Sequence, residues 1–316
     1  MLNIYRSDST TFWDLSLSNL TRNCWFNLIN PNPEELNQVE AATGVPQDIL
    51  KAALDEEERS RIEVEDHYIL VLTNLPIIRG ETNYDTLPLG IILTADYIIT
   101  ICLENNAVIS EFHPHLYRTF NTAKRTRFLF QILYKTAIHY LKYLRQINRR
   151  TDEIELDLRK SMKNKEIIQL MELQRGLTYF NASLRTNGVV LEKLLRLRST
   201  SQSRHLISMY DEDEDLLEDV IIENNQAMQM VDMYSNILSG MMDAFASIIS
   251  NNLNIVMKFL ASITIILAVP TMLASFWGMN VPVPFTDNGW GFIFVIVIAL
   301  ALTGISAYTL WKKDMF

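Results

Sequence analysis

The residues best suited to handling an ion lie at the end of an uncharged stretch near the C-terminus. The segment "SFWGMNVPVPF" (275–285) follows an apolar run of membrane-spanning length and has no charged side chain. Gly278 lets the backbone leave a helix, Met279 packs adaptably, and Asn280 supplies an amide. Mg²⁺ prefers oxygen ligands and gives up its waters reluctantly. A ring of such amides, which bonds the waters of a hydrated ion, would therefore suit Mg²⁺.

A stripe of small, polar or flexible side chains leads up to this segment. Its members recur at alternating steps of three and four residues, which places them on one face of a helix. They are Asn254, Met257, Ala261, Thr264, Ala268, Thr271, Ser275 and Gly278. Two interpretations are open, because membrane helices pack through small residues and several copies of such a face can also surround an aqueous path. The polar, uncharged ending at Asn280 favours the path.

Two uncharged stretches are long enough to carry this face across a bilayer. Between Lys258 and Lys312 the only charged residue is Asp287. The spans expected at about 258–277 and 290–311 each provide the roughly 20 residues that a hydrocarbon core of about 30 Å requires. Two spans cannot enclose a channel, so we expect a homo-oligomer embedded in the lipid bilayer.

The basic residues around the spans indicate their orientation. Lys258 precedes the first span and Lys312 and Lys313 follow the second, whereas the connecting loop 278–289 has no Lys or Arg. By the positive-inside rule both termini lie in the cytoplasm. We expect a multi-pass protein of the cell membrane.

The chain before the spans divides into two parts. Residues 1–115 alternate β-branched apolar runs with helix-start signals, which predicts a cytoplasmic α/β domain. Residues 116–257 contain no proline and predict a stalk region of long helices, at about 119–161, at about 165–198 and from Asp211 onward. The expected strands are "CWFNLI", "YILVLTNLPII", "LGIILTA" and "DYIITICL", and the expected short helices are "NPEELNQVEAATG" and "PQDILKAALDEEE".

The third long helix carries a second pattern. From Leu217 to Ile255 a mostly apolar seam repeats every 3.5 residues, interrupted by Asn224 and Asn252. That period is typical of helices packed side by side. No breaker separates the seam from the first span, so a helix from Asp211 to Phe276 would be roughly 100 Å long.

Composition and motifs exclude several other functions. The net charge of −9 argues against binding nucleic acid and fits a protein that handles cations. Cys24 and Cys102 lie in apolar runs and are expected as buried free thiols. No phosphate-cradling glycine motif or nucleophile elbow occurs, and His113 and His115 lack a nearby third ligand, so we expect neither an enzyme nor an organic cofactor.

On these residues the sequence resembles the CorA family of divalent-cation channels. The likeness rests on "GMN" (278–280) after the penultimate span, one further span and the tail "WKKDMF", with support from "NIVMKFL", "SGMMDAF" and "LDEEERSRIEVEDHYIL". The resemblance implies a funnel-shaped homopentamer with a cytoplasmic α/β domain, long stalk helices and two transmembrane helices. It also implies conduction of Mg²⁺ into the cytoplasm.

The resemblance further implies roles for individual residues. A selectivity filter would comprise Gly278, Met279 and Asn280. The pore lining would comprise Asn254, Met257, Leu260, Thr264, Ala268, Thr271 and Ser275. Met257 and Leu260 would form a gate that closes by dewetting. A basic collar would comprise Lys258, Lys312 and Lys313. Trp277 replaces the tyrosine that commonly precedes the tripeptide, and Asp287 is the only acid in the loop.

Gating by cytoplasmic Mg²⁺ bound between subunits also follows from the resemblance. Asp219 falls at the stalk position of a cation ligand, but Ala52 occupies the partner position, where an acid is expected. Carboxylates about one helical turn further on could replace it, namely Asp55, Glu56, Glu57 and Glu58.

Three alternatives are open. The same fold could transport Zn²⁺, Co²⁺ or Ni²⁺, or the chain could be a membrane-anchored cation sensor that does not conduct. The third alternative concerns the acidic segment "YDEDEDLLED" (210–219). It is typical of a helix N-terminus, where the dipole favours negative charge, and it could also bind a cation.

Overall fold

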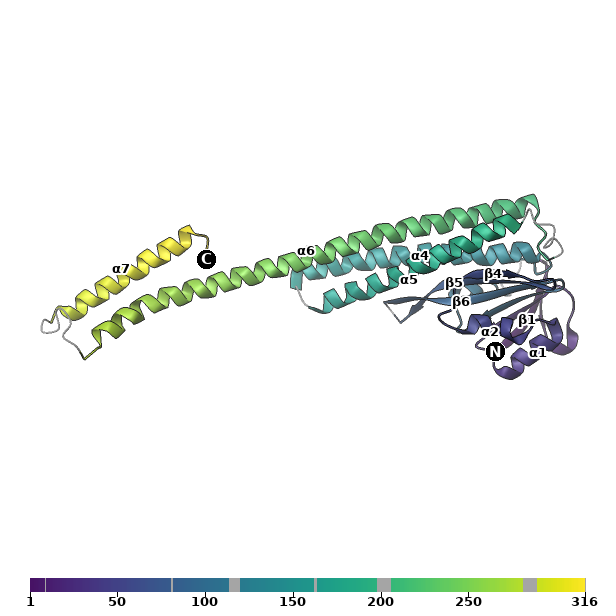
Figure 1. The fold of residues 1–316 in the computed structure, drawn as a ribbon, viewed down its shortest axis with the longest axis horizontal. Coiled ribbons are helices and arrows are strands. Elements are labelled where there is room, and N and C mark those ends of the chain that lie inside the picture. The colour runs from purple at the N-terminus through teal and green to yellow at the C-terminus, as the bar shows by residue number, and fades with distance from the viewer. Residues whose placement is uncertain are drawn as a thin grey trace. The chain divides into compact units, whose positions relative to one another are not determined.

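The chain forms two compact units, Met1–Gly240 and Met241–Phe316, and is shown as a computed structural model in Figure 1. The structure describes residues 1–8, 10–80, 82–113, 120–161, 164–197, 206–280 and 289–315.

A seven-stranded mixed sheet lies at the centre of the first unit. Its strands run in the order β2 (Phe12–Leu15), β1 (Leu2–Ser7), β3 (Cys24–Ile29), β7 (Tyr97–Cys102), β6 (Asn83–Thr94), β5 (Tyr68–Arg79) and β4 (Arg61–Val64). Among the strands of the described residues, β3 and β7 pair in parallel and the other neighbours pair antiparallel. The four expected strands are confirmed as β3, β5, β6 and β7, whereas β1, β2 and β4 were not expected from the sequence.

Helices cover both faces of this sheet. One face packs against α1 (Pro33–Thr43) and α2 (Gln47–Lys51). The other packs against α3 (Ala107–Ser110), α4 (Arg125–Ser161), α5 (Asn164–Leu197) and the first part of α6 (Asp211–Trp277). Along β5, Ile69 and Val71 belong to the second core and Leu70 and Leu72 to the first. Successive strand residues point to opposite faces, which explains why this strand is an uninterrupted apolar run.

The predicted helix "PQDILKAALDEEE" is shorter than expected. Helix α2 ends at Lys51, a 3₁₀ turn covers Ala52–Leu54, and Asp55 is extended. The Asp55 carboxylate accepts a hydrogen bond from the Glu57 N–H at 3.0 Å, and such a local turn competes with helix formation. The idea that the acidic residues continue a helix by one further turn is therefore wrong.

Helix α4 also begins later than expected. Position 119 lies outside the described residues, and residues 120–124 are not helical. The Ser7 N–H donates to the Thr122 hydroxyl at 3.0 Å and the Thr122 N–H donates to the Ser7 carbonyl at 3.0 Å. These bonds hold the chain against β1, so the helix starts only at Arg125.

The seam of α6 packs along α4 and α5, which lie beside it in Figure 1. Its buried members are Leu217, Val220, Asn224, Ala227, Val231, Leu238 and Phe245. Asn224 donates to the Leu184 carbonyl at 3.2 Å, which satisfies a polar group on the seam. Further along, Ile248 and Ile255 are exposed. Within the first unit the prediction of side-by-side packing is thus confirmed as far as Leu238.

Two smaller features complete the first unit. Cys24 and Cys102 are buried free thiols, as predicted. Gly176 on α5 lies against β6, where an added Cβ would be 2.8 Å from the Cβ of Tyr84 and 3.2 Å from its carbonyl oxygen. A side chain at this position would therefore separate the helix from the sheet.

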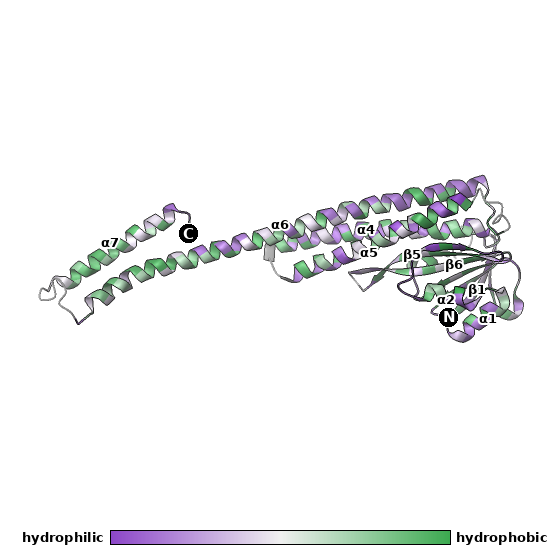
Figure 2. Cartoon of the chain, viewed as in Figure 1, coloured by the Kyte–Doolittle hydropathy of each residue, from purple (hydrophilic) through white to green (hydrophobic). Residues whose placement is uncertain are grey.

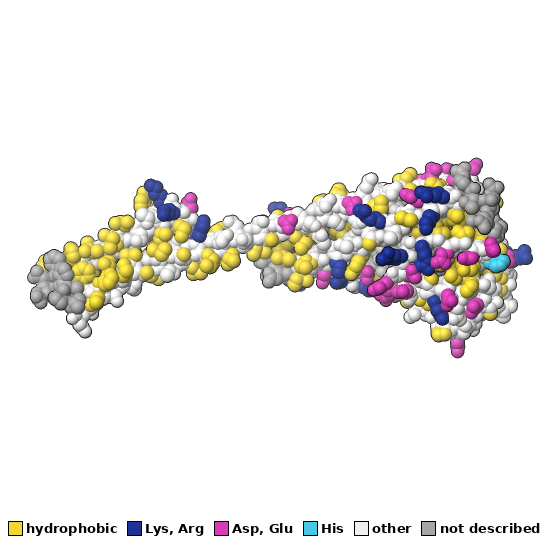
Figure 3. Space-filling model, viewed as in Figure 1, with side chains coloured by type: hydrophobic (Ala, Val, Ile, Leu, Met, Phe, Trp, Pro, Cys, Tyr) yellow, Lys and Arg dark blue, Asp and Glu magenta, His cyan; other side chains and the backbone are white. Residues whose placement is uncertain are grey.

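The second unit contains the C-terminal part of α6 and α7 (Gly291–Lys312). Figure 2 shows that α7 and the last part of α6 are hydrophobic along their length. Both α6 and α7 are long and apolar enough to cross a membrane. Their large apolar side chains are exposed in this single chain (Figure 3), as expected for helices that meet lipid or other copies.

Candidate functional site

The candidate site begins where α6 ends. The helix continues to Trp277, after which the Gly278 N–H donates to the Ala274 carbonyl at 3.0 Å and the Met279 N–H to the Phe276 carbonyl at 3.4 Å. The tripeptide 278–280 therefore closes the helix directly, and all three residues are exposed. The predicted loop residues from 281 to 288, including both prolines and Asp287, lie outside the described residues.

The predicted pore-lining residues form a single exposed stripe on α6. All seven are exposed, namely Asn254, Met257, Leu260, Thr264, Ala268, Thr271 and Ser275. The less exposed face lies elsewhere and comprises Ser262, Ile266, Val269 and Leu273. On that face the Ser262 hydroxyl donates to the Met315 carbonyl, just after α7. The chain's own second span therefore leaves the stripe uncovered.

Local hydrogen bonds keep the polar side chains of the stripe close to their helix. The Thr264 hydroxyl donates to the Leu260 carbonyl at 2.8 Å, and the Thr271 hydroxyl donates to the carbonyls of Leu267 and Ala268 at 3.0 and 2.9 Å. Each hydroxyl oxygen keeps its lone pairs for an outside donor such as a water bound to a cation. An open groove of about 470 Å³ follows the stripe, lined by Ala268, Thr271, Met272, Ser275, Phe276 and Met279.

The proposed gate and collar lie at the other end of the span. Met257 and Leu260 are 59% and 54% exposed. Lys258 lies between them on the sequence and is exposed, as are Lys312 and Lys313 at the end of α7. The Ser262 hydroxyl donates to the Met315 carbonyl, just after the end of α7. Because Ser262 follows Lys258 by four residues, the end of α7 lies about one helical turn of α6 from Lys258. The three lysines thus belong to the same end of the unit.

The residues of the predicted regulatory site are accessible but are not assembled in one chain. Asp219 is exposed on α6, and Asp55, Glu56 and Glu57 are exposed in the turn after α2. Glu58 is ion-paired with Arg61. Among the described residues, no three His, Cys, Asp or Glu side chains are grouped so that they could hold a metal ion.

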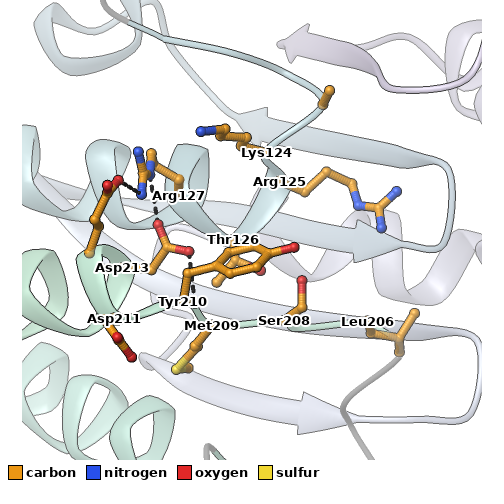
Figure 4. Close-up of a pocket in the computed structure, with 12 residues that line it drawn as sticks. Lys124, Arg125, Thr126, Arg127, Leu206, Ser208, Met209, Tyr210, Asp211 and Asp213 are labelled. Atoms are coloured by element: carbon orange, nitrogen blue, oxygen red, sulfur yellow. Dashed lines mark hydrogen bonds and ion pairs between the residues drawn. The ribbon is translucent and has the colours of Figure 1, made fainter.

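The acidic start of α6 is already occupied by an arginine of α4. Figure 4 shows Arg127 beside this segment, with Nε 2.7 Å from an oxygen of Asp213 and Nη2 2.5 Å from an oxygen of Glu212. These hydrogen bonds raise the pKa of Arg127. Asp213 also accepts the Tyr210 N–H at 3.2 Å and so caps the helix. The observed contacts favour the helix-cap interpretation of "YDEDEDLLED" over cation binding.

Sequence reasoning missed two contacts near the site. The hydrogen bond of Ser262 to the tail was not expected, because Ser262 falls off the polar stripe and its partner is a backbone carbonyl. The pairing of Arg127 with Asp213 was also missed, because these residues are 86 positions apart. Ser262 is one of several hydroxyl-bearing residues in this apolar run, so its side-chain type gave no distinguishing signal. His113 is described and lies in the loop before α4, and His115 lies outside the described residues.

Comparisons with known proteins agree with this arrangement. A curated cobalt/magnesium transport protein CorA of Methanocaldococcus jannaschii is 26% identical over 294 residues, which are 90% of this chain and 88% of the relative. That of Thermotoga maritima is 20% identical over 295 residues, 92% of this chain and 82% of the relative. The complete structure of the CorA magnesium transporter of M. jannaschii matches with a TM-score of 0.82 and 24% identity, over 98% of this chain and 96% of that one.

The observed fold, with its mixed sheet, long helices and two candidate spans, is therefore the CorA fold. The sequence profile of the family described as "CorA-like Mg2+ transporter protein" matches residues 21–313, nearly the whole chain. The chain belongs to the CorA-like Mg²⁺ transporter family.

Proposed function

We propose that several copies of this chain form a channel that conducts hydrated Mg²⁺ across the cell membrane into the cytoplasm. The observation that carries this proposal is the continuous helix α6, whose exposed polar stripe crosses the apolar span and ends at the exposed tripeptide 278–280. By resemblance to the family the assembly is a homopentamer. The relatives' names, cobalt/magnesium transport protein, support a divalent cation as substrate.

The proposed driving force is the membrane potential. Moving one elementary charge across 100 mV is worth about 2.3 kcal/mol, so a divalent ion gains about 4.6 kcal/mol without ATP. This requires the positive-inside orientation, with Lys258, Lys312 and Lys313 on the cytoplasmic side.

The proposed filter acts on the ion's bound water. Asn280 from each copy would present an amide oxygen to the hydrated ion, and no carboxylate within the described part of the turn would strip its shell. Mg²⁺ favours such outer-shell recognition because it dehydrates reluctantly. Co²⁺ is a further candidate substrate, because both curated relatives are named for cobalt and magnesium.

The experiment that tests the filter is Mg²⁺ uptake into liposomes that contain the purified protein and an internal Mg²⁺ indicator. We expect Asn280→Ala to abolish or strongly reduce uptake, whereas Asn251→Ala, an exposed asparagine outside the stripe on the same helix, should leave it intact. Uptake unchanged in Asn280→Ala would refute the filter. Competition by Co²⁺, Ni²⁺ and Zn²⁺ in the same assay identifies the preferred ion.

We further propose that cytoplasmic Mg²⁺ closes the channel by binding between subunits. Asp219 of one copy and the acidic turn Asp55–Glu57 of the next would share the ion. When internal Mg²⁺ falls, the uncompensated carboxylates repel and the neck formed by Met257 and Leu260 becomes wet.

Protease protection tests this sensing site without reference to conduction. We expect Mg²⁺ to slow proteolysis of the unmodified protein and Asp219→Asn to shift the effect to higher Mg²⁺ concentration. Glu218→Gln removes an adjacent exposed charge from the same helix and is the matched control. Equal shifts for the two variants would indicate a general charge effect and not a specific site.

A further inference from the structure

Helix α7 ends in a turn with a defined geometry. The Asp314 N–H donates to the Trp311 carbonyl at 3.1 Å and the Met315 N–H donates to the Leu310 carbonyl at 3.2 Å. These two bonds are the Schellman pattern of a helix C-terminus. Asp314 occupies its left-handed position with φ of 52°, a conformation that glycine adopts freely and aspartate occasionally. The turn holds the backbone of Met315 directly beside the end of α7.

Ser262 is the residue of α6 that contacts this turn. It is completely buried, whereas Ala261 and Thr264 beside it are exposed. Its hydroxyl donates to the Met315 carbonyl at 2.9 Å. The hydroxyls of Thr264 and Thr271, in contrast, bond carbonyls of α6 itself. Ser262 is thus the described α6 hydroxyl that links the pore helix to the end of the outer helix.

The position of this contact along α6 relates it to the gate. Ser262 follows Leu260 by two residues and Met257 by five, which is roughly 3 and 7.5 Å along the helix axis. A displacement of α6 that widens the neck at these residues must either carry the end of α7 with it or break the hydrogen bond.

We propose that the turn Lys313–Met315 is a latch that holds α6 in place at the neck, and that Ser262 is a positioning residue for the gate. The effect of the latch on transport rests on the proposed function, whereas the contact between Ser262 and the turn is part of the fold. Loss of the bond frees α6 from α7 and favours the wet neck. Interhelical hydrogen bonds in membranes are weak, so we expect an increase of about threefold per subunit in transport at high internal Mg²⁺.

The first test measures the latch without any ion transport. In a Ser262→Cys background the thiol keeps the place of the hydroxyl and is a weak donor toward the same carbonyl. We expect the turn still to cover it, so a membrane-permeant maleimide should modify it slowly, whereas Ala261→Cys should be modified rapidly. Cys24 and Cys102 are buried and contribute little background. Adding Asp314→Val should accelerate modification at position 262, because a β-branched residue disfavours positive φ. Adding Asp314→Gly should not.

The pair of substitutions at Asp314 separates geometry from charge. Both remove the carboxylate, but only Asp314→Val opposes the left-handed conformation. Equal modification rates at position 262 in the two backgrounds would show that the turn does not cover the residue and would overturn the proposal.

The second test measures Mg²⁺ uptake into liposomes at high and low internal Mg²⁺. We expect Ser262→Ala and Asp314→Val to raise uptake at high internal Mg²⁺ and to shift closure to higher Mg²⁺ concentration. Asp314→Gly should match the unmodified protein. So should Ser247→Ala, whose hydroxyl donates within α6 to the Asp243 carbonyl. Native mass measurement verifies that all variants form the same oligomer.

The outcomes of the two tests are distinguishable. If the unmodified protein transports no Mg²⁺, the proposed function fails, and the labelling rates still decide whether the latch exists. If labelling behaves as expected but Ser262→Ala closes at the same Mg²⁺ concentration as the unmodified protein, the turn does not act on the gate and the proposal is overturned.

Discussion

Replacing Leu260 by asparagine should make the proposed channel leak. Met257 and Leu260 are the large apolar residues of the predicted pore lining between Asn254 and Thr264. Asn254 and Thr264 are ten residues apart and thus separated by roughly 15 Å along α6. A narrow apolar passage of this length excludes water and so stops a hydrated ion. Leu260→Asn places a polar group inside it and leaves an apolar stretch of only about 9 Å.

The size of the effect follows from the exposure of the side chain. Complete burial of a leucine is worth about 1.5–3 kcal/mol, and Leu260 is 54% exposed in the single chain. Leu260→Asn therefore lowers the free energy of hydrating the neck by about 1 kcal/mol per copy. This difference raises the probability that the neck contains water by about fivefold per copy. Each copy that faces the ion path contributes this factor, and the factors multiply. The probability of a wet neck in the oligomer should therefore rise by much more than fivefold.

Mg²⁺ uptake into liposomes loaded with high internal Mg²⁺ measures this leak directly, because the unmodified channel should then be closed. Ile265→Asn is the matched control, since Ile265 is exposed on the same span but lies off the stripe. We expect uptake to rise in Leu260→Asn alone, with the oligomer unchanged by native mass measurement. Equal uptake in the two variants, with both correctly assembled, would refute the assignment of the neck.

Three further predictions concern the first unit. Gly176→Ala should lower the free energy of unfolding by about 1–3 kcal/mol, measured by chemical denaturation in detergent, because the added methyl meets a backbone carbonyl; Gly240→Ala, with open space around it, should not be destabilised. Arg127→Met should lower the free energy of unfolding by about 2 kcal/mol in the same assay, because Asp213, 4% exposed, is left as a buried carboxylate without its cation. The loss is moderate because Arg127 is itself partly exposed to solvent. Burial opposes ionisation of Glu111, but hydrogen bonds from Lys135 and His139 outweigh it and lower its pKa below the ordinary value of a glutamate. Its contribution to stability is therefore complete above the pKa of the unfolded state and is lost as the pH falls through the lowered pKa of the folded state. Glu111→Gln should therefore reduce the fall of the melting temperature at acidic pH.

Local patterns were sufficient to predict the long helices. The continuous helix from the stalk into the membrane followed from a 3.5-residue repeat without a breaker, and the observed α6 (Asp211–Trp277) agrees with it. The short strands β1, β2 and β4 were missed because strands of four to six residues carry little periodicity and are stabilised by their neighbours in the sheet. The end of α2 was misplaced because Asp55 forms a turn that helix propensity does not reveal.

The sequence by itself determined the parts of the candidate site that lie on one helix, because a regular helix converts spacing into a shared face. Hence the stripe from Asn254 to Ser275 and its end at Asn280 could be identified from the sequence, and these residues are exposed in the structure. The contact of Ser262 with the Met315 carbonyl was decided only by the tertiary structure. It joins two helices through a backbone atom and a left-handed turn, and neither partner has a side-chain type or spacing that marks it in the sequence.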